Sequence, residues 1–437
     1  MYRQVNQTYR EHFDLLIGSG LYRTLTGRGL LIPHEEVELS EAAAPGAYRV
    51  LRPEPVGFVS YPYEWCFGQL KAAALATLEI QQAAMDHGMS LRDASAYNVQ
   101  FLSGRPVLID TLSFERLREG EPWVAYRQFC QHFLAPLALM SYRDVRLSQL
   151  LRVHIDGIPL DLVAELLPRR ARLRASLLLH IFGHAKSQAR HALGGANHFK
   201  EGRRFTAQAF RGLISNLESG IRNLSWKPSR SAWSGYYAEA DSYSPEALTH
   251  KKALVAEFVT RADPHSVWDL GTNTGLFSRI SSDRRIPTVS FDIDPECVEA
   301  SYSEVVAKGE DCLLPLLLDL TNPSPALGWA NRERMSLARR GPADMVLALA
   351  LVHHLAIGNN VPLDQVAAFL RELCTWLAVE FVPKVDPKVQ LLLASREDIF
   401  PEYTREGFEH SFSASFSIER QEPISGSERT LYLLRSR

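Results

Sequence analysis

The chain has 437 residues, of which 46% are hydrophobic and 22% are charged, so we expect an ordinary globular protein with at least two domains. Its formal net charge of −2 excludes an overall attraction to nucleic acid or to an anionic membrane, so any such partner must bind a local patch. Five cysteines stand without Cys-x-x-Cys spacing, and this pattern indicates neither a disulfide framework nor a zinc cluster. The start of the chain has no apolar stretch and no apolar run reaches the ~18 residues of a membrane span. We therefore expect a cytoplasmic protein with no signal peptide and no membrane span.

The amino-terminal half is predicted to be mixed at its start and mostly helical later. Residues 1 to about 60 combine short β-like runs with turns. Residues 67–85 carry apolar side chains at helical spacing, and Gly88 is suited to end that helix. Two β-like runs, residues 99–101 and 106–110, flank Ser103-Gly104 and predict a hairpin. Residues 123 to about 220 look mostly helical.

A run of acidic and amide residues precedes and follows the predicted hairpin. Asp93 and Asn98 are five residues apart, and Asp110 follows twelve residues later. This spacing resembles the catalytic loop and metal-binding aspartate of the protein-kinase and aminoglycoside-phosphotransferase superfamily. The resemblance implies that Asp93 orients a hydroxyl group and that Asn98 and Asp110 hold Mg²⁺ with a nucleotide. No lysine precedes Lys71 and no Gly-rich loop is present, so we expect a degenerate site that binds rather than phosphorylates.

The segment 169–204 is strongly basic, with Glu201 as its single acidic residue. It could bind a phosphate-bearing ligand, although a solvated basic helix face is the commoner outcome for such a pattern. After it, Lys227-Pro228-Ser229-Arg230-Ser231 interrupts the helical pattern and indicates a domain boundary. We therefore predict one domain over residues 1–226, which binds a substrate or a partner, and a second over residues 227–437.

The second domain opens with a pattern that is typical of a nucleoside-cofactor site. Residues 267–270 read as a strand, residues 271–275 as a Gly-containing turn, and residues 289–292 as a second strand that ends in Asp292. Glycines in such a turn let the backbone approach a ligand, the following helix offers free N–H groups, and an acid roughly 20 residues downstream can hold a ribose diol.

The sequence Asp269-Leu270-Gly271-Thr272-Asn273-Thr274-Gly275 resembles motif I of the class I S-adenosylmethionine-dependent methyltransferases. Asn273 stands where the family usually has its middle glycine, and asparagine is one of the few residues that enter left-handed backbone conformations. The resemblance implies that Asp269, Gly271 and Gly275 border the methionine part of the cofactor and that Asp292 pairs with its ribose. A Rossmann-like domain for another nucleoside cofactor is the alternative.

Later strands extend this resemblance. Asp319 follows the apolar run 313–318, where the family places a carboxylate near the adenine. Residues 344–350 match the fourth strand, so Leu349 is expected to border the cofactor too. His353 and His354 follow that strand on the side of the reaction centre, and one of them is the candidate general base.

Further candidates surround this predicted reaction centre. Glu380, Lys384 and Asp386 end the fifth strand on the same rim, and Tyr236, Tyr243 and Lys251 precede the domain, where such enzymes often place a helix over the cofactor. Residues 412–419 and 429–434 suit the antiparallel closing hairpin of this class.

We thus expect an α/β protein. Its carboxy-terminal domain is a doubly wound, seven-stranded, Rossmann-like methyltransferase domain, and its amino-terminal domain is an α+β, kinase-like, mostly helical domain. The expected function is methyl transfer from S-adenosylmethionine to an unidentified oxygen or nitrogen acceptor. A bifunctional kinase and methyltransferase, or a non-catalytic scaffold that binds the cofactor, are the alternatives.

Overall fold

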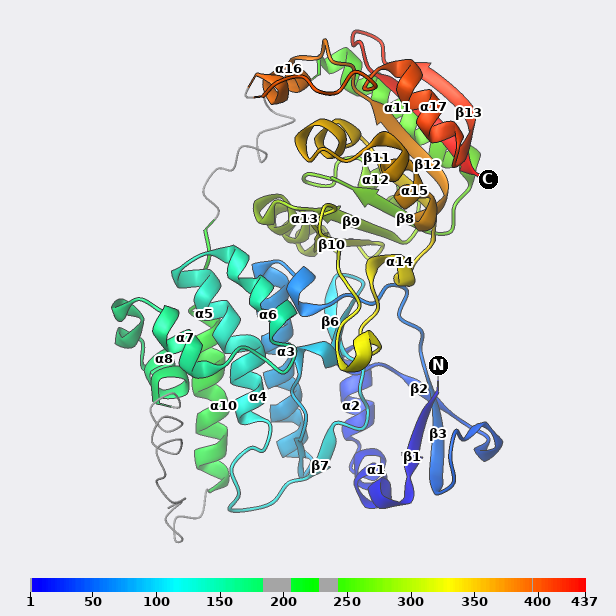
Figure 1. The fold of residues 1–437 in the computed structure, drawn as a ribbon. Helices are drawn as coiled ribbons and strands as arrows, with labels where there is room; N and C mark the ends of the chain where they lie inside the picture. Colours follow the sequence, from blue (N-terminus) through cyan, green and yellow to red (C-terminus); the bar gives the residue numbers. More distant parts are fainter. Residues whose placement is uncertain (1, 184–205, 228–242, 395) are drawn as a thin grey trace. The chain divides into compact units, whose positions relative to one another are not determined.

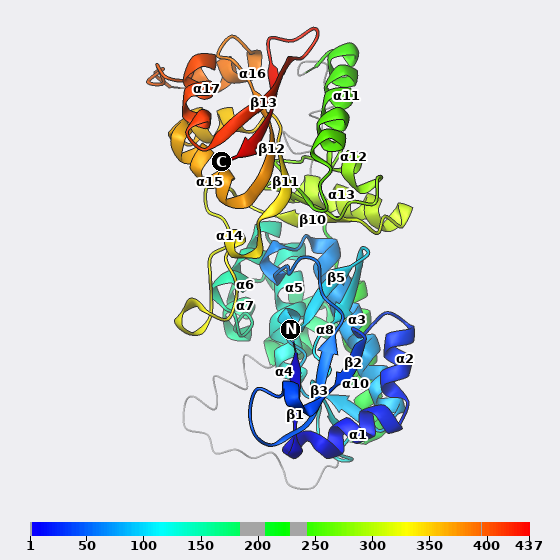
Figure 2. The same cartoon turned by 90° about the vertical axis from the view of Figure 1, so that its right-hand side faces the viewer.

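The structure is a computed structural model that describes residues 2–183, 206–227, 243–394 and 396–437 (Figures 1 and 2). The chain divides into two compact units, residues 1–227 and 228–437. Each unit is described by itself. Among the residues described, no helix is both long and apolar enough to cross a membrane.

The carboxy-terminal unit is built on a seven-stranded sheet with the order β10-β9-β8-β11-β12-β14-β13. The strands are β8 (Val267–Leu270), β9 (Thr288–Asp292), β10 (Leu313–Leu317), β11 (Ala343–Ala348), β12 (Cys374–Phe381), β13 (Phe416–Pro423) and β14 (Thr430–Ser436). The first five strands are parallel, and β14 runs antiparallel to both β12 and β13. The doubly wound sheet and its closing hairpin are therefore confirmed.

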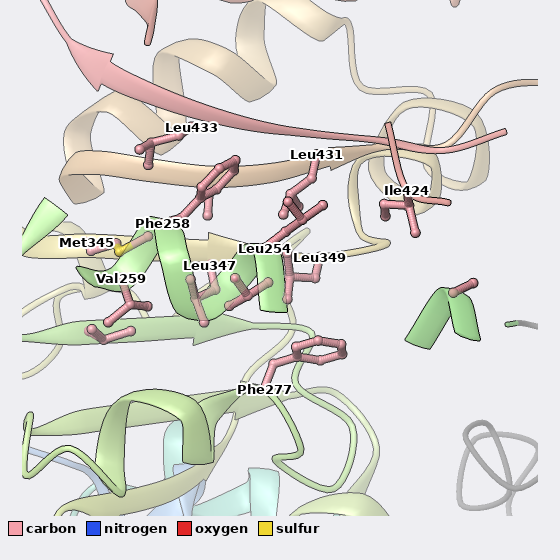
Figure 3. Packing of buried hydrophobic residues seen from close by; sticks show 14 residues of the cluster. Leu254, Phe258, Val259, Phe277, Met345, Leu347, Leu349, Ile424, Leu431 and Leu433 are labelled. Carbon is pink, nitrogen blue, oxygen red and sulfur yellow. The ribbon is translucent and has the colours of Figure 1, made fainter. Parts of the chain in front are cut away.

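Helices cover both faces of this sheet, as a parallel sheet requires. They are α11 (Pro245–Ala262), α12 (Ser278–Ser282), α13 (Pro295–Lys308), α14 (Leu337–Arg340), α15 (Leu363–Leu373), α16 (Pro387–Leu393) and α17 (Arg405–Ser413). Helix α11 presents Leu254 and Phe258 to Leu347 of β11 in one hydrophobic core (Figure 3). On the opposite face Phe408 of α17 packs on Phe381 of β12, with ring centroids 5.2 Å apart.

The start of the closing hairpin lies later than its sequence suggests. Residues 412 and 413 end helix α17 and do not open β13, so the prediction of a strand from Phe412 is wrong at its start. The reason is local. Thr404 caps the helix by accepting a hydrogen bond from the N–H of Gly407, and Phe408 and Phe412, one helical turn apart, are both buried.

The amino-terminal unit contains a three-stranded antiparallel sheet with the order β1-β3-β2 and two smaller strand pairs. The strands are β1 (Arg3–Asn6), β2 (His34–Val37), β3 (Ala47–Pro53), β4 (Met89–Leu91), β5 (Val99–Leu102), β6 (Arg105–Leu108) and β7 (Phe114–Arg116). Strands β5 and β6 form the predicted hairpin, whose turn holds Ser103 and Gly104 at φ of 50° and 71°. Helix α3 (Phe67–Asp86) confirms the predicted long helix, and Gly88 follows its end at φ of 72°.

The other α-helices described in this unit are mostly short. They are α1 (Arg10–Gly18), α2 (Leu21–Gly27), α4 (Tyr126–Phe129), α5 (Ala135–Tyr142), α6 (Leu150–Val153), α7 (Leu160–Leu166), α8 (Ala175–Leu177) and α10 (Ala207–Arg222). Helix α10 runs beside α3 (Figures 1 and 2). Residues 184–205, which form the larger part of the predicted basic segment 169–204, lie outside the described residues.

Candidate functional site

A cavity of about 360 Å³ lies at the carboxyl ends of the parallel strands in the carboxy-terminal unit. Its lining combines apolar side chains with a few polar groups, as small-molecule sites usually do. The lining residues are Lys251, Gly271, Asn273, Asp292, Ile293, Leu318, Asp319, Leu320, Thr321, Leu349, Ala350, Leu351, His354, Leu355 and Asn359. Of the nine residues predicted above to bind the cofactor or act as base, six line this cavity, namely Gly271, Asn273, Asp292, Asp319, Leu349 and His354. Asp269, Gly275 and His353 do not line it.

The loop after β8 brings the backbone to the cavity. Gly271, Asn273 and Gly275 all have positive φ, at 74°, 53° and 83°. Side chains rarely adopt this left-handed conformation, which explains glycine at two of the positions. Asn273 compensates at the third position, since its side-chain Oδ1 accepts a hydrogen bond from the N–H of Thr274 at 2.8 Å. Within this loop Gly271 is exposed, and Gly271 and Asn273 line the cavity, so backbone that a nucleoside cofactor could approach lies at the cavity wall.

Asp292 ends β9 and faces the cavity. Its Oδ2 accepts the N–H of Asn273 at 2.6 Å, and its Oδ1 accepts the N–H of Asp294 at 2.9 Å. Burial raises the pKa of Asp292 to about 6, against the opposing effect of these two hydrogen bonds. The carboxylate is held in a fixed orientation beside the loop, and it can accept further hydrogen bonds from ligand hydroxyl groups.

Asp269 near the end of β8 and Gly275 in the loop do not line the cavity. Asp269 is buried and accepts a hydrogen bond from the hydroxyl of Ser278 at 2.6 Å, and burial raises its pKa to about 6. A Cβ atom at Gly275 would lie 2.9 Å from Ser301 Oγ and 3.0 Å from Arg279 Nη1. These two motif residues therefore shape the loop from within the fold.

Asp319 follows β10 and lines the cavity at the edge of the sheet. Its Oδ1 accepts hydrogen bonds from the N–H and the hydroxyl of Thr321, at 2.8 and 2.6 Å. This local turn fixes one carboxylate oxygen, while Leu318 and Leu320 supply apolar surface on either side. Such a pairing of apolar surface with a hydrogen-bond acceptor suits one end of a purine ring.

The two candidate bases differ in their access to the cavity. His354 lines it, whereas His353 is buried and does not. Neither ring nitrogen of His353 has a hydrogen-bond partner among the described residues. Burial, followed by the charge of Arg429, lowers the pKa of His354, and burial with the neighbouring charges lowers the pKa of His353 well below its usual value. Both rings are therefore neutral at pH 7, and His354 is the one placed to accept a proton from a ligand.

The backbone around His354 is held by two side chains. His354 begins a π-helical turn, His354–Gly358, and its carbonyl oxygen accepts a hydrogen bond from the Asn359 side chain at 2.8 Å. Arg396 donates to the carbonyl oxygens of Ile357 and Gly358 at the end of the same turn. Irregular backbone beside the cavity is thereby fixed in place, as π-helical turns at functional sites often are.

Several rim residues form a buried network at the end of β12. Lys251 and Glu380 form a buried ion pair, Tyr243 bonds to both, and Asp386 pairs with Arg429. Arg429 was missed as a site residue because the sequence presents it as the first residue of a predicted strand. Lys384 is separate from this network and pairs with Asp398 at 2.7 Å, and Tyr236 lies outside the described residues.

The predicted trio of the amino-terminal unit has local partners. Asp93 accepts the N–H of Ser95 at 2.9 Å, and Asp110 accepts the hydroxyl of Ser113 at 2.6 Å. Asn98 is the last residue of a short 3-10 turn whose N-cap is Ser95. Within the described parts of the chain, no group of three or more His, Cys, Asp or Glu residues could hold a metal ion. The structure thus gives no support to Mg²⁺ at this place, and nucleotide binding stays a prediction.

Strand order and site together define the class of protein. Numbered within the unit, the sheet order is 3-2-1-4-5-7-6, which is the Rossmann-like order 3-2-1-4-5 extended by an antiparallel closing hairpin. With a glycine-containing loop after the first strand and an acid at the end of the second, this is the fold of the class I methyltransferases.

The chain belongs to the family of nodulation protein NoeA. NoeA of Rhizobium meliloti (strain 1021) is 39% identical over 420 residues, which are 94% of this chain and 87% of that protein. No protein-family model matches the sequence.

Solved structures of methyltransferases are also similar to parts of the chain. The bifunctional kinase-methyltransferase WbdD matches with a TM-score of 0.29 and 16% identity over 43% of this chain and 39% of WbdD. Magnesium protoporphyrin IX methyltransferase (ChlM) from Synechocystis PCC 6803 with bound SAH matches with a TM-score of 0.31 and 18% identity, over 44% of this chain and 84% of ChlM. At these scores the similarities carry no argument, and the fold assignment rests on the strand order.

Proposed function

We propose that residues 227–437 form an S-adenosylmethionine-dependent methyltransferase that acts on an oxygen or nitrogen atom of an acceptor. The observation that carries the proposal is the cavity, in which the loop residues Gly271 and Asn273 meet Asp292 and His354. These groups come from three different strand ends, and a parallel sheet brings such ends together at its ligand-binding edge. Residues 1–226 are assigned to binding of the substrate or a partner.

The residues present fit the cofactor. The positive φ of Gly271 leaves its backbone open to a ligand, and Asp292 offers a buried acceptor for ribose hydroxyls. Asp319 and Leu349 would border the base, on apolar walls that also include Leu318. When bound, the cofactor supplies a methyl group that is already activated on a sulfonium.

The protein then has three tasks, which are to align donor and acceptor, to exclude water and to accept a proton. The apolar residues Leu351 and Leu355 line the cavity beside His354 and exclude water from its ring. Because burial lowers its pKa, the His354 ring is neutral at pH 7, and we assign it the role of the base that takes the proton of an attacking hydroxyl or amine.

Calorimetry with S-adenosylhomocysteine tests the cofactor assignment. Wild-type protein should bind it, and Asp292→Ala should weaken binding by about 10- to 150-fold, as loss of a charge-assisted hydrogen-bond partner predicts. Because the pKa of Asp292 is about 6, wild-type affinity should also fall as the pH drops through 6 and the carboxylate becomes protonated. Asp311→Ala removes an exposed carboxylate that pairs with Arg285 in the same unit, and it should bind like wild type.

Two results would contradict this assignment in different ways. If the wild-type protein does not bind S-adenosylhomocysteine, the proposed function is wrong. If binding is present but Asp292→Ala leaves it unchanged, the protein binds the ligand at another place. Incubation of the wild-type protein with labelled S-adenosylmethionine and a cell extract would then identify the acceptor.

A further inference from the structure

A buried pair of opposite charges lies beside the cavity, on the face of the sheet that α11 covers. Lys251 of α11 has 1% of its side chain exposed and Glu380 of β12 has 0%, and Lys251 Nζ lies 2.6 Å from Glu380 Oε2. The hydroxyl of Tyr243 donates to Glu380 Oε1 at 2.5 Å and accepts from Lys251 Nζ at 2.9 Å. Lys251 also contributes to the cavity lining.

The charge of Lys251 also acts on a second carboxylate, that of Asp269 on β8. Asp269 is level with Leu347, and Leu347 with Ala378, in neighbouring parallel strands. Glu380 is two residues beyond Ala378, so Asp269 and Glu380 project from the same face of the sheet toward α11. Lys251 counteracts the rise that burial causes in the pKa of Asp269. One ammonium group therefore links the ends of β8 and β12.

A second buried pair continues the network to the closing hairpin. Arg429 Nε and Nη2 donate to the two oxygens of Asp386 at 2.7 and 3.1 Å, and Arg429 Nη1 lies 3.6 Å from Glu380 Oε1. The charged and titratable groups around Lys251 are Tyr243, Asp269, His353, Glu380 and Arg429. Asp386 joins the network through its pair with Arg429.

Buried ion pairs are a poor source of stability, because the loss of hydration offsets much of the attraction between the charges. Apolar residues of similar size would hold α11 on the sheet as well as this pair does. The network instead lies at the one edge of the sheet where the cavity opens and where the motif loop is anchored through Asp269 and Ser278. Its location indicates a role in the geometry of the site.

We propose that Lys251 is a positioning residue of the cofactor cavity, which holds α11 across the ends of β8 and β12 and neutralises the two carboxylates that flank it. The inference rests on the proposed function and deepens it. It also predicts a dependence on pH. As the pH falls toward 6, Asp269, whose pKa burial raises to about 6, takes up a proton and no longer needs the ammonium group, so loss of Lys251 should matter less there. Glu380 stays ionised over this range, because the effect of burial is outweighed by the charges of Lys251 and Arg429, which lower its pKa.

The test compares S-adenosylhomocysteine binding by full-length wild type, Lys251→Met, Lys251→Arg and the double variant Lys251→Met/Glu380→Gln at pH 6 and pH 8. At pH 8 the dissociation constant of Lys251→Met should be on the order of tenfold larger than that of wild type. At pH 6 the difference between the two dissociation constants should be smaller. Lys251→Arg keeps the charge and should retain most of the affinity. The double variant removes the carboxylate left unpaired and should recover part of the loss at pH 8.

The outcomes separate this inference from the proposed function. If wild type binds and the dissociation constants of Lys251→Met and wild type have the same ratio at both pH values, the inference is wrong while the proposed function stands. If wild type does not bind, both are wrong. Should Lys251→Met fail to fold at pH 8, the double variant decides. If the folded double variant binds S-adenosylhomocysteine more weakly than wild type at pH 8, the inference is supported. If it binds with wild-type affinity, the inference is wrong.

Discussion

Local turns hold acidic side chains in both units, but those of the carboxy-terminal unit come from separate strands and line one cavity, whereas Asp93 and Asp110 flank a single hairpin, where Asp110 also pairs with Arg3. Asp292 and Asp319 end or follow different strands and both line the cavity. Asp93 and Asp110 accept hydrogen bonds from residues two and three positions further along. Both sets matched a family motif by spacing.

The two units differ in how well the spacing of motif residues along the sequence predicts a shared site. A parallel sheet forces the carboxyl ends of neighbouring strands to one edge, so residues at those ends converge whatever loops connect them. A short hairpin gives no such guarantee, because its flanking Asp and Ser residues readily satisfy each other in local turns. A motif is thus stronger when the topology itself brings its members together.

The largest expected effect concerns His354, the histidine after β11 that lines the cavity. Replacing His354 by Asn should lower methyl transfer about 10²- to 10⁴-fold without changing cofactor affinity, because the general base is lost. The measurement is labelled methyl incorporation into the acceptor, with calorimetry of S-adenosylhomocysteine as the control. Near-normal transfer by His354→Asn would place the base elsewhere or show that the acceptor needs none.

A smaller effect is expected from one glycine in each unit. Gly275→Ala and Gly88→Ala both place a side chain at positive φ, which costs about 1–2 kcal/mol. At Gly88 the added Cβ meets open space, but at Gly275 it meets Ser301 and Arg279, and the crowding adds about 1–3 kcal/mol. Urea unfolding of the full chain measures both costs. Only Gly275→Ala should also weaken S-adenosylhomocysteine binding, and equal binding by the two variants would contradict the assigned loop.

The smallest effect is expected in the amino-terminal unit. Asp110→Ala should leave S-adenosylhomocysteine binding unchanged, and neither it nor the wild type should transfer phosphate from ATP with Mg²⁺. The reason is that Asp110 bonds to Ser113 and pairs with Arg3 at 3.7 Å, in a unit without a metal-binding cluster among its described residues. Magnesium-dependent phosphate transfer that Asp110→Ala abolishes would instead establish a bifunctional enzyme.

Much of the fold could be predicted because its signals are local. The apolar period of residues 67–86 and the turn residues Ser103 and Gly104 each specify structure over a few residues. The same is true of the loop at Gly271, whose glycine is explained by its backbone conformation alone. The assignment of these segments needed no knowledge of distant contacts.

The unpredicted part depends on contacts between distant residues. Lys251, Glu380 and Arg429 belong to three separate segments, and only the folded sheet brings them together. The sequence also could not tell that Asp269 would bond to Ser278 and lie outside the cavity lining, since both roles call for an acid near the end of a buried strand. The roles of the site residues and the cytoplasmic location stay predictions.

The buried network has a practical consequence for dividing the chain. Tyr243 precedes α11 and Arg429 precedes the last strand, yet the two side chains bond to each other and both contact Glu380. A fragment that started after Tyr243 would lose a hydrogen-bond donor to Glu380, and one that stopped before Arg429 would leave the Asp386 carboxylate without its buried cation. Soluble expression of the carboxy-terminal unit alone should therefore require a start ahead of residue 243 and an end that keeps Arg429 and the inner strand β14.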